Sequence, residues 1–382
     1  MPARRLLVVL AAAAVATASC TTTGGGSLPG PTGPLATSTT STTSTTGPQS
    51  PASSATGGTQ PSGTATSIAV SPSPSTSAGT VAGNTKTIAR TVHADELGVV
   101  PVLMYHQLVA TPGKDRYNET PAAFLAELTR LERDGYVPIT AAQFAAGAID
   151  VPAGKHPVVL TFDDATTSQF QLGADDHPVP DCAVGIMQAF AETHPDFPAR
   201  ATFFVNKGAF AKTPNPLQWL TDNGFEVAVH TVSHANLGTL TDAKVQKEIG
   251  DNFQTILAAT GKAPTTFALP YGVHAKNRVL ELRGTTGGKS YSISGVFLVG
   301  SDPSKSPFRK GFDVANIHRI RSQSTPGGPN DQPYESAAEL TVLEQHPERL
   351  YTSDGDPKVV SYPKSRAKDV GTLPAGLVRN AY

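Results

Sequence analysis

Short apolar runs alternate with amphipathic segments through the second half of the chain, and polar or glycine-containing turns separate them. The runs that predict buried strands lie at residues 99–105, 158–162, 201–205, 225–229 and 265–269. The intervening segments carry apolar residues at helical spacing, as at Phe124, Leu128 and Leu131. Strands that alternate with helices predict an α/β fold, with parallel strands joined by right-handed crossovers.

The helix starts are marked by capping residues. Thr120 precedes Pro121, Asn215 precedes Pro216, and Thr241 precedes a long amphipathic segment. Asp181 is the expected N-cap of a helix that runs to about residue 193. Residues 92–382, which contain all of these elements, are close to the length of one α/β barrel. Beyond about Ser322 the chain is rich in Pro and Gly, and we expect an irregular stretch there.

Polar side chains gather where the expected strands end. Asp163 and Asp164 follow the second run, His230 and His234 follow the fourth, and Tyr271 follows the fifth. The carboxyl ends of barrel strands meet at one rim, where such folds place their active sites. We therefore expect these five residues to share a site.

One carboxylate and two imidazoles form a ligand set that leaves a position open for water, as in catalytic zinc sites. The second carboxylate of the Asp163-Asp164 pair can then act as a base. An Asp pair after a strand is often only a helix cap beside a solvated neighbour. The apolar run before it and the histidine pair at the parallel position favour function. Asp175, Asp176 and His177, in a loop next to prolines, are interpreted as a solvated turn.

The first part of the chain predicts export. Residues 1–20 combine a basic start, an apolar core and small residues, as a signal peptide does. Residues 21–91 are rich in Ser, Thr, Gly and Pro, and predict a disordered tether. Cys20 at this junction is typical of a lipoprotein lipidation site, although Thr17 departs from that motif. The alternative is cleavage near Ala18 and secretion.

Composition restricts the partners. The net charge is -1 and the pI is about 6.8, so nothing indicates a nucleic-acid surface. Membrane contact is expected only through a lipid anchor at Cys20, and a monomer is expected. Cys182 is the other cysteine, so the chain has no disulfide framework. A neutral polymer or a small molecule is the expected partner.

Three motifs together resemble a known family. They are Thr161-Phe162-Asp163-Asp164, His230-Thr231-Val232-Ser233-His234 and Phe267-Ala268-Leu269-Pro270-Tyr271-Gly272. They are similar to the successive motifs of the polysaccharide deacetylases, the NodB-homology or carbohydrate esterase family four fold. The resemblance covers about residues 99–321, and residues 100–106 resemble the branch that contains bacterial poly-β-1,6-N-acetylglucosamine deacetylases.

The resemblance implies a distorted (β/α)₇ barrel and a divalent metal, with Zn²⁺ expected and Co²⁺ or Ni²⁺ as alternatives. It implies Asp164, His230 and His234 as metal ligands and Asp163 as general base. It also places the backbone N–H of Tyr271 at the oxyanion.

Two histidines compete for the role of general acid. His318 resembles the late Leu-x-His motif of the family, whereas His106 stands where the poly-N-acetylglucosamine branch has an active-site histidine. We favour His106, because the match at His318 rests on two residues. Ala268 stands where many members have an arginine that orients the catalytic aspartate. Asp163 is therefore expected to depend on the metal and its other neighbours for its charge.

The expected function is removal of N-acetyl groups from an amino-sugar polymer of the cell envelope, either peptidoglycan or poly-N-acetylglucosamine. An O-acetyl esterase acting on a xylan-like polysaccharide is the alternative within the fold. A non-catalytic module that binds wall glycan is an alternative of another class, suggested by Ala268. The expected location is the outer face of the cell membrane, or the medium if the chain is secreted.

Overall fold

The computed structural model describes residues 78–111, 113, 115–300, 302–322 and 335–382. Its central feature is one sheet in the strand order β12-β9-β8-β7-β6-β2-β14, with β5 also paired to β6. Every pairing within this sheet is parallel. The strands are β2 (Val102–Tyr105), β5 (Tyr136–Ile139), β6 (His156–Asp163), β7 (Thr202–Val205), β8 (Glu226–Val229), β9 (Thr266–Ala268), β12 (Gly295–Phe297) and β14 (Ile320–Arg321).

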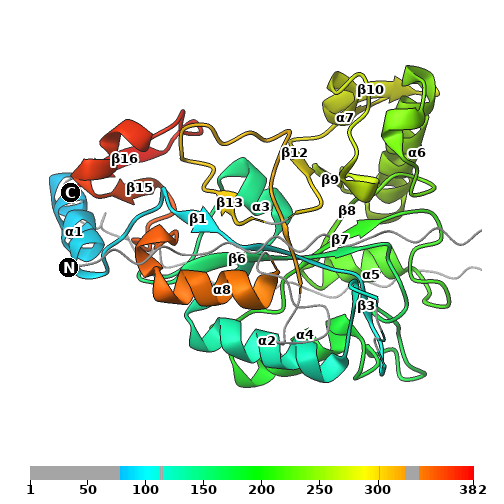
Figure 1. The fold of residues 1–382 in the computed structure, drawn as a ribbon, viewed down its shortest axis with the longest axis horizontal. Coiled ribbons are helices and arrows are strands. Elements are labelled where there is room, and N and C mark those ends of the chain that lie inside the picture. The colour runs from blue at the N-terminus through cyan, green and yellow to red at the C-terminus, as the bar shows by residue number, and fades with distance from the viewer. Residues whose placement is uncertain (1–77, 112, 114, 301, 323–334) are drawn as a thin grey trace, which may run out of the picture. The chain divides into compact units, whose positions relative to one another are not determined.

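Helices cover the outer face of the sheet, and α2, α4 and α8 lie together along one side of it (Figure 1). The helices are α2 (Pro121–Arg133), α3 (Ala141–Ala146), α4 (Ala183–Thr193), α5 (Pro216–Asp222), α6 (Asp242–Thr260), α7 (Val279–Leu282) and α8 (Ser336–Gln345). The expected starts at Thr120, Asn215 and Thr241 are confirmed as N-caps. The helix α4 begins one residue later than expected, because Cys182 rather than Asp181 is its N-cap.

The segment at residues 317–321 lies against both edges of the curled sheet. Ile317 forms a parallel bridge with Phe297 of β12, while Ile320 and Arg321 pair with β2 on the other edge. One segment thereby links the first and last strands of the curl. The predicted α/β barrel is confirmed in this distorted form.

Alternation along the strands sorts the apolar side chains into two clusters. On β6, Leu160 and Phe162 pack in the cluster that includes α2, α4, α5, α6 and α8. Val159 packs in a second cluster with Phe204 and Phe297 from neighbouring strands and with residues of α3. Successive strand residues point to opposite faces. Thr161 and Asp163 therefore share the inward face with Val159.

The folded part begins earlier than the sequence indicated, and its end is more regular. The end of the expected tether forms helix α1 (Ala78–Thr91), in which Ala89 is fully buried. The expected tether before residue 78 and the expected signal peptide lie outside the described residues. The end of the chain, expected to be irregular, contains α8 and a parallel pair of strands, β15 (Val359–Tyr362) and β16 (Val378–Ala381).

A smaller difference concerns the first expected strand. Pro101 divides the expected strand at residues 99–105 into β2 and a separate short strand, β1 (Val99–Val100), which pairs antiparallel with β13 (Ser304–Lys305). A proline has no N–H to donate to a ladder, which explains the interruption.

Among the described residues, no helix combines the length and the apolar character that crossing a membrane requires.

Candidate active site

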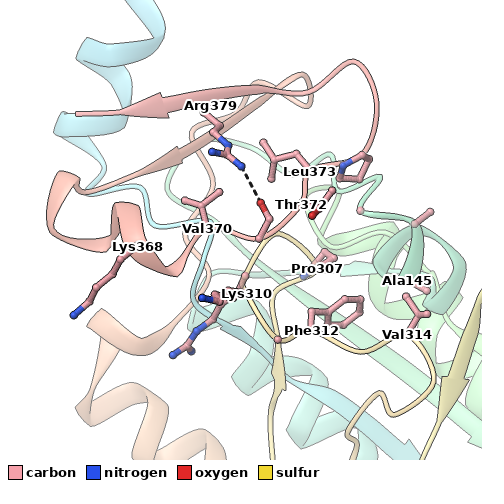
Figure 2. Close-up of a pocket in the computed structure, with 16 residues that line it drawn as sticks. Ala145, Pro307, Lys310, Phe312, Val314, Lys368, Val370, Thr372, Leu373 and Arg379 are labelled. Carbon is pink, nitrogen blue, oxygen red and sulfur yellow. Dashed lines mark hydrogen bonds between the residues drawn. The ribbon is translucent and has the colours of Figure 1, made fainter.

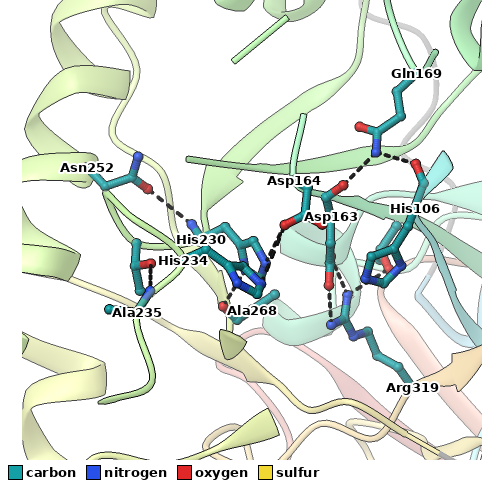
Figure 3. Close-up of polar contacts among 12 residues, drawn as sticks. His106, Asp163, Asp164, Gln169, His230, His234, Ala235, Asn252, Ala268 and Arg319 are labelled. Atoms are coloured by element: carbon teal, nitrogen blue, oxygen red, sulfur yellow. Dashed lines mark hydrogen bonds and ion pairs between the residues drawn. The ribbon is translucent and has the colours of Figure 1, made fainter. Parts of the chain in front are cut away.

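Asp163 is the last residue of β6 and points into the barrel (Figure 3). Its side chain is only 2% exposed, and both carboxylate oxygens accept hydrogen bonds from the guanidinium of Arg319, each at 2.7 Å. Arg319 is fully buried, and its Nε donates to the carbonyl oxygen of Leu298 at 2.6 Å. A bidentate contact between two buried groups holds the carboxylate in one position and favours its ionised form.

The charge of Asp163 follows from this pair. Burial alone would raise the pKa of Asp163, but the charge and hydrogen bonds of Arg319, together with the nearby His230 and His106, outweigh burial and hold the pKa well below its usual range. Arg319, which the sequence did not single out, is one of the neighbours on which Asp163 was expected to depend for its charge. Arg319 lies in the segment that joins the two sheet edges. It provides the positive charge that an arginine at position 268 would provide in many family members.

Asp164 turns away from Asp163 and faces two histidines. One of its oxygens lies 3.5 Å from Nε2 of His230 and 3.5 Å from Nε2 of His234. One ligand atom from each of the three residues lies within 4.8 Å of the others, which is a spacing that a metal ion can bridge. Burial alone would raise the pKa of Asp164, but the adjacent His230 lowers it below its usual value.

His230 shows that this site fits a metal. Its Nδ1 lies 2.8 Å from the carbonyl oxygen of Ala268, which can only accept, so Nδ1 carries the proton. Its Nε2 then presents a lone pair, yet this atom is buried and has no hydrogen-bond partner. A ligating histidine is usually oriented by such a hydrogen bond from its other ring nitrogen. The backbone N–H of His230 also donates to Asn252 at 3.1 Å.

His106 lies in the same cavity as the carboxylates and the histidine pair. The cavity is about 230 Å³ and is also lined by Tyr117 and Tyr271. The Nδ1 of His106 is buried without a partner. Burial lowers the pKa of His106, although Asp163 and Asp164 oppose this effect.

A buried glutamine links the two strands that carry these groups. The side-chain nitrogen of Gln169 donates to the carbonyl oxygens of His106 and Asp163, each at 2.5 Å. It therefore ties the end of β2 to the end of β6, and sets the position of His106 relative to Asp163. Gln169 lies in the polar loop after β6, and no sequence pattern predicts this contact.

His318 does not join this group. Its side chain is half exposed, its Nδ1 lies 3.8 Å from Asp302, and it lines a different cavity. Asp175 and His177 are also exposed, as a solvated turn requires.

Tyr271 is 62% exposed and packs edge-on against the ring of His234, with ring centres 4.5 Å apart. Its φ of 60° is unusual for a residue with a bulky side chain. Four other residues without glycine's freedom have positive φ here: Asp164, Ala165, Thr231 and His234. Backbone strain concentrated in this way, at about 1–3 kcal/mol per residue, is typical of functional sites.

Comparison with known proteins agrees with the motifs. Residues 150–286 match the family model described as polysaccharide deacetylase. This segment contains Asp163, Asp164, His230, His234 and Tyr271. It is a polysaccharide deacetylase domain of the NodB type.

Curated relatives of this deacetylase domain carry related names. The chain is 24% identical over 170 residues to a peptidoglycan-N-acetylglucosamine deacetylase of Bacillus cereus, covering 43% of this chain and 56% of the relative. It is 27% identical over 139 residues to a chitooligosaccharide deacetylase of a Bradyrhizobium species, covering 36% of this chain and 55% of the relative. The chain thus spans little more than half the length of these relatives.

Two solved deacetylases also match the chain, at low identity. The Streptococcus pyogenes deacetylase PplD is 18% identical, with 61% of this chain and 96% of that chain covered and a TM-score of 0.46. IcaB from Ammonifex degensii is also 18% identical, with 59% and 92% covered and a TM-score of 0.44. His106 and Arg319 lie outside the segment that matches the family model.

Proposed function

We propose that this protein is a metal-dependent hydrolase that removes N-acetyl groups from an amino-sugar polymer. The observation that carries the proposal is one cavity lined by the triad of Asp164, His230 and His234 and by Asp163, whose carboxylate is paired with the buried Arg319 behind it. Three ligands with a separate ionised carboxylate next to them suit hydrolysis rather than structural metal binding.

The residues divide the chemistry between them. Asp164, His230 and His234 would hold a divalent ion, which polarises an acyl oxygen and lowers the pKa of water when it is bound. Asp163 takes the proton of the attacking water, and Arg319 keeps it ionised for that purpose. A proton acceptor in such a position typically contributes about 10²–10⁴-fold to the rate.

The leaving amine needs a proton, and we assign its donation to His106 rather than His318. His106 lines the catalytic cavity, and burial favours loss of its proton, which makes the protonated ring a stronger acid. The backbone N–H of Tyr271 is assigned to the oxyanion. One such donor typically stabilises the transition state by about 2.7–4 kcal/mol.

The size of the cavity supports a group on a polymer as the substrate. A volume of about 230 Å³ is small for a ligand site, so it suits an acetamido group while the sugar chain stays outside. Tyr117 and Tyr271, which are 39% and 62% exposed, present rings at the mouth for sugar contacts. Export and tethering through residues 1–77 would bring the domain to peptidoglycan or to poly-N-acetylglucosamine.

The test is acetate release from chitohexaose and from an acetylated xylo-oligosaccharide. The protein is first stripped with a chelator and then reloaded with Zn²⁺, Co²⁺ or Ni²⁺. We expect release from chitohexaose only after reloading, and slower release from the O-acetyl substrate. Equal release of acetate from chitohexaose before and after chelation would contradict the metal dependence. Faster release from the O-acetyl sugar would contradict the assignment of an N-acetyl substrate.

The assignment of His106 gives a further prediction. We expect His106→Gln to slow acetate release from chitohexaose by about 10²–10⁴-fold, because the amine then leaves without a proton donor. Hydrolysis of p-nitrophenyl acetate, whose leaving group needs no proton, should fall much less. His318→Gln is the matched control and should leave both rates near those of the wild type. The reverse pattern between the two variants would transfer the acid role to His318.

A further inference from the structure

A second cavity lies outside the catalytic site and has a different character (Figure 2). Its volume is about 750 Å³, and it is formed by the end of α3, residues 307–314 and residues 368–379. These segments fall outside residues 150–286, which match the family model. The cavity is therefore built by parts of the chain other than the shared catalytic segment.

The cavity lies near the opposite end of β12 from the catalytic site. Val314, in its lining, accepts a hydrogen bond from the backbone N–H of Val296 at 2.7 Å, next to the start of that strand. Val299, just after the end of β12, lines the catalytic cavity. A ligand in this cavity therefore does not occupy the catalytic site.

Four cationic side chains line this cavity, and no carboxylate does. They are Arg309, Lys310, Lys368 and Arg379. Among the described residues none of the four forms an ion pair, and Arg379 donates only to the carbonyl oxygen of Gly371 at 3.0 Å. The catalytic cavity, in contrast, contains three aspartates and no Lys or Arg. The two cavities therefore favour ligands of opposite charge.

The wall opposite the cations is apolar. Figure 2 shows Lys310, Lys368 and Arg379 on one side and Ala145, Val314 and Leu373 on the other. Phe312 packs edge-on against Phe144, with ring centres 5.7 Å apart, which fixes this wall to the barrel. A cationic wall facing an apolar wall suits a ligand with anionic groups and apolar C–H faces, and both are features of a charged sugar ring.

We propose that this cavity binds an anionic glycan, with carboxylate or phosphate groups against Arg309, Lys310, Lys368 and Arg379 and sugar rings against the apolar wall. It would hold the enzyme on a charged polymer while the catalytic cavity acts on acetylated sugars. The binding requires neither the metal nor catalysis, so it can be tested separately from the proposed function.

The test is isothermal titration calorimetry of the full chain with a hyaluronan hexasaccharide, which carries carboxylates, and with neutral chitohexaose. We expect Lys310→Gln/Lys368→Gln to weaken hyaluronan binding about tenfold, since two surface ion pairs between the lysines and the hyaluronan carboxylates are lost. Binding of chitohexaose should be unchanged. Raised salt should weaken the wild type in the same direction. Both lysines are exposed, so the double variant should keep the fold.

The matched control is Lys244→Gln/Lys289→Gln, which removes the same charge from exposed positions elsewhere and should bind like the wild type. Tripolyphosphate and vesicles of phosphatidylglycerol test other sources of negative charge. The proposal is overturned if both double variants bind hyaluronan as the wild type does. It is also overturned if tripolyphosphate or the vesicles bind the wild type more tightly than hyaluronan and lose that binding in Lys310→Gln/Lys368→Gln.

Discussion

Replacing Arg319 by methionine is expected to reduce the free energy of unfolding by about 3–5 kcal/mol, because it leaves the buried charge of Asp163 without a partner. Both side chains of the pair are almost fully buried, so water cannot replace the guanidinium. Urea unfolding of the metal-free proteins measures this directly. The control is Arg133→Met, which removes an exposed arginine paired with Asp134 and should change stability little.

The same variant is expected to change the pH dependence of activity. In the wild type the pKa of Asp163 is depressed, so the carboxylate stays ionised as the pH falls. Without Arg319, burial dominates and the pKa rises, so Asp163 becomes protonated at a higher pH. The acid limb of kcat/KM should therefore move to higher pH. An unchanged acid limb together with unchanged stability would contradict the role given to Arg319.

Asp163→Asn is expected to lower kcat for acetate release by about 10²–10⁴-fold while metal binding is kept, because the amide cannot accept the proton of water. Metal content and acetate release are measured on the same samples, so that loss of metal cannot account for loss of rate. The control is Asp175→Asn, an exposed carboxylate in the solvated turn, which should retain activity. Full activity in Asp163→Asn would exclude Asp163 as the base.

A double variant separates charge from position. Asp163→Asn leaves the guanidinium of Arg319 buried without its carboxylate, and Arg319→Met leaves the carboxylate without its cation. In Asp163→Asn/Arg319→Met both charges are absent, so the loss of stability should be smaller than the sum of the two single losses. Additive losses would show that the two side chains do not interact in the folded protein.

The sequence predicted the barrel, and it predicted that Asp163, Asp164, His230 and His234 lie together, because both predictions depend on local patterns. The apolar run that ends at Asp163 shows a strand and its carboxyl end at once, and the spacing of His230 and His234 suggests ligands. The folded ends of the chain were missed because α1 follows a long low-complexity segment, and because β15 and β16 are short and separated by a proline-containing loop. Neither end of the folded part shows the hydrophobic periodicity from which the other elements were predicted.

The pairing of Arg319 with Asp163 could not be predicted from the residues next to Arg319 in the sequence. It lies 156 positions from Asp163, and only the segment that joins the two sheet edges brings them together. An arginine between Ile317 and Ile320 in a strand-like stretch was the available signal, since a buried arginine needs a partner. Gln169 gave no signal at all, because its role depends on the path of a loop.

Metal binding by Asp164→Ala is the most direct test of the central claim, which is that Asp164, His230 and His234 hold the ion on which hydrolysis depends. Equilibrium dialysis of chelated proteins against Zn²⁺ would be followed by measurement of acetate release from chitohexaose. We predict one ion and full activity for the wild type and for Asp175→Ala, and loss of both for Asp164→Ala. If Asp164→Ala kept the zinc content and the activity of the wild type, the claim that Asp164, His230 and His234 hold the ion would be contradicted.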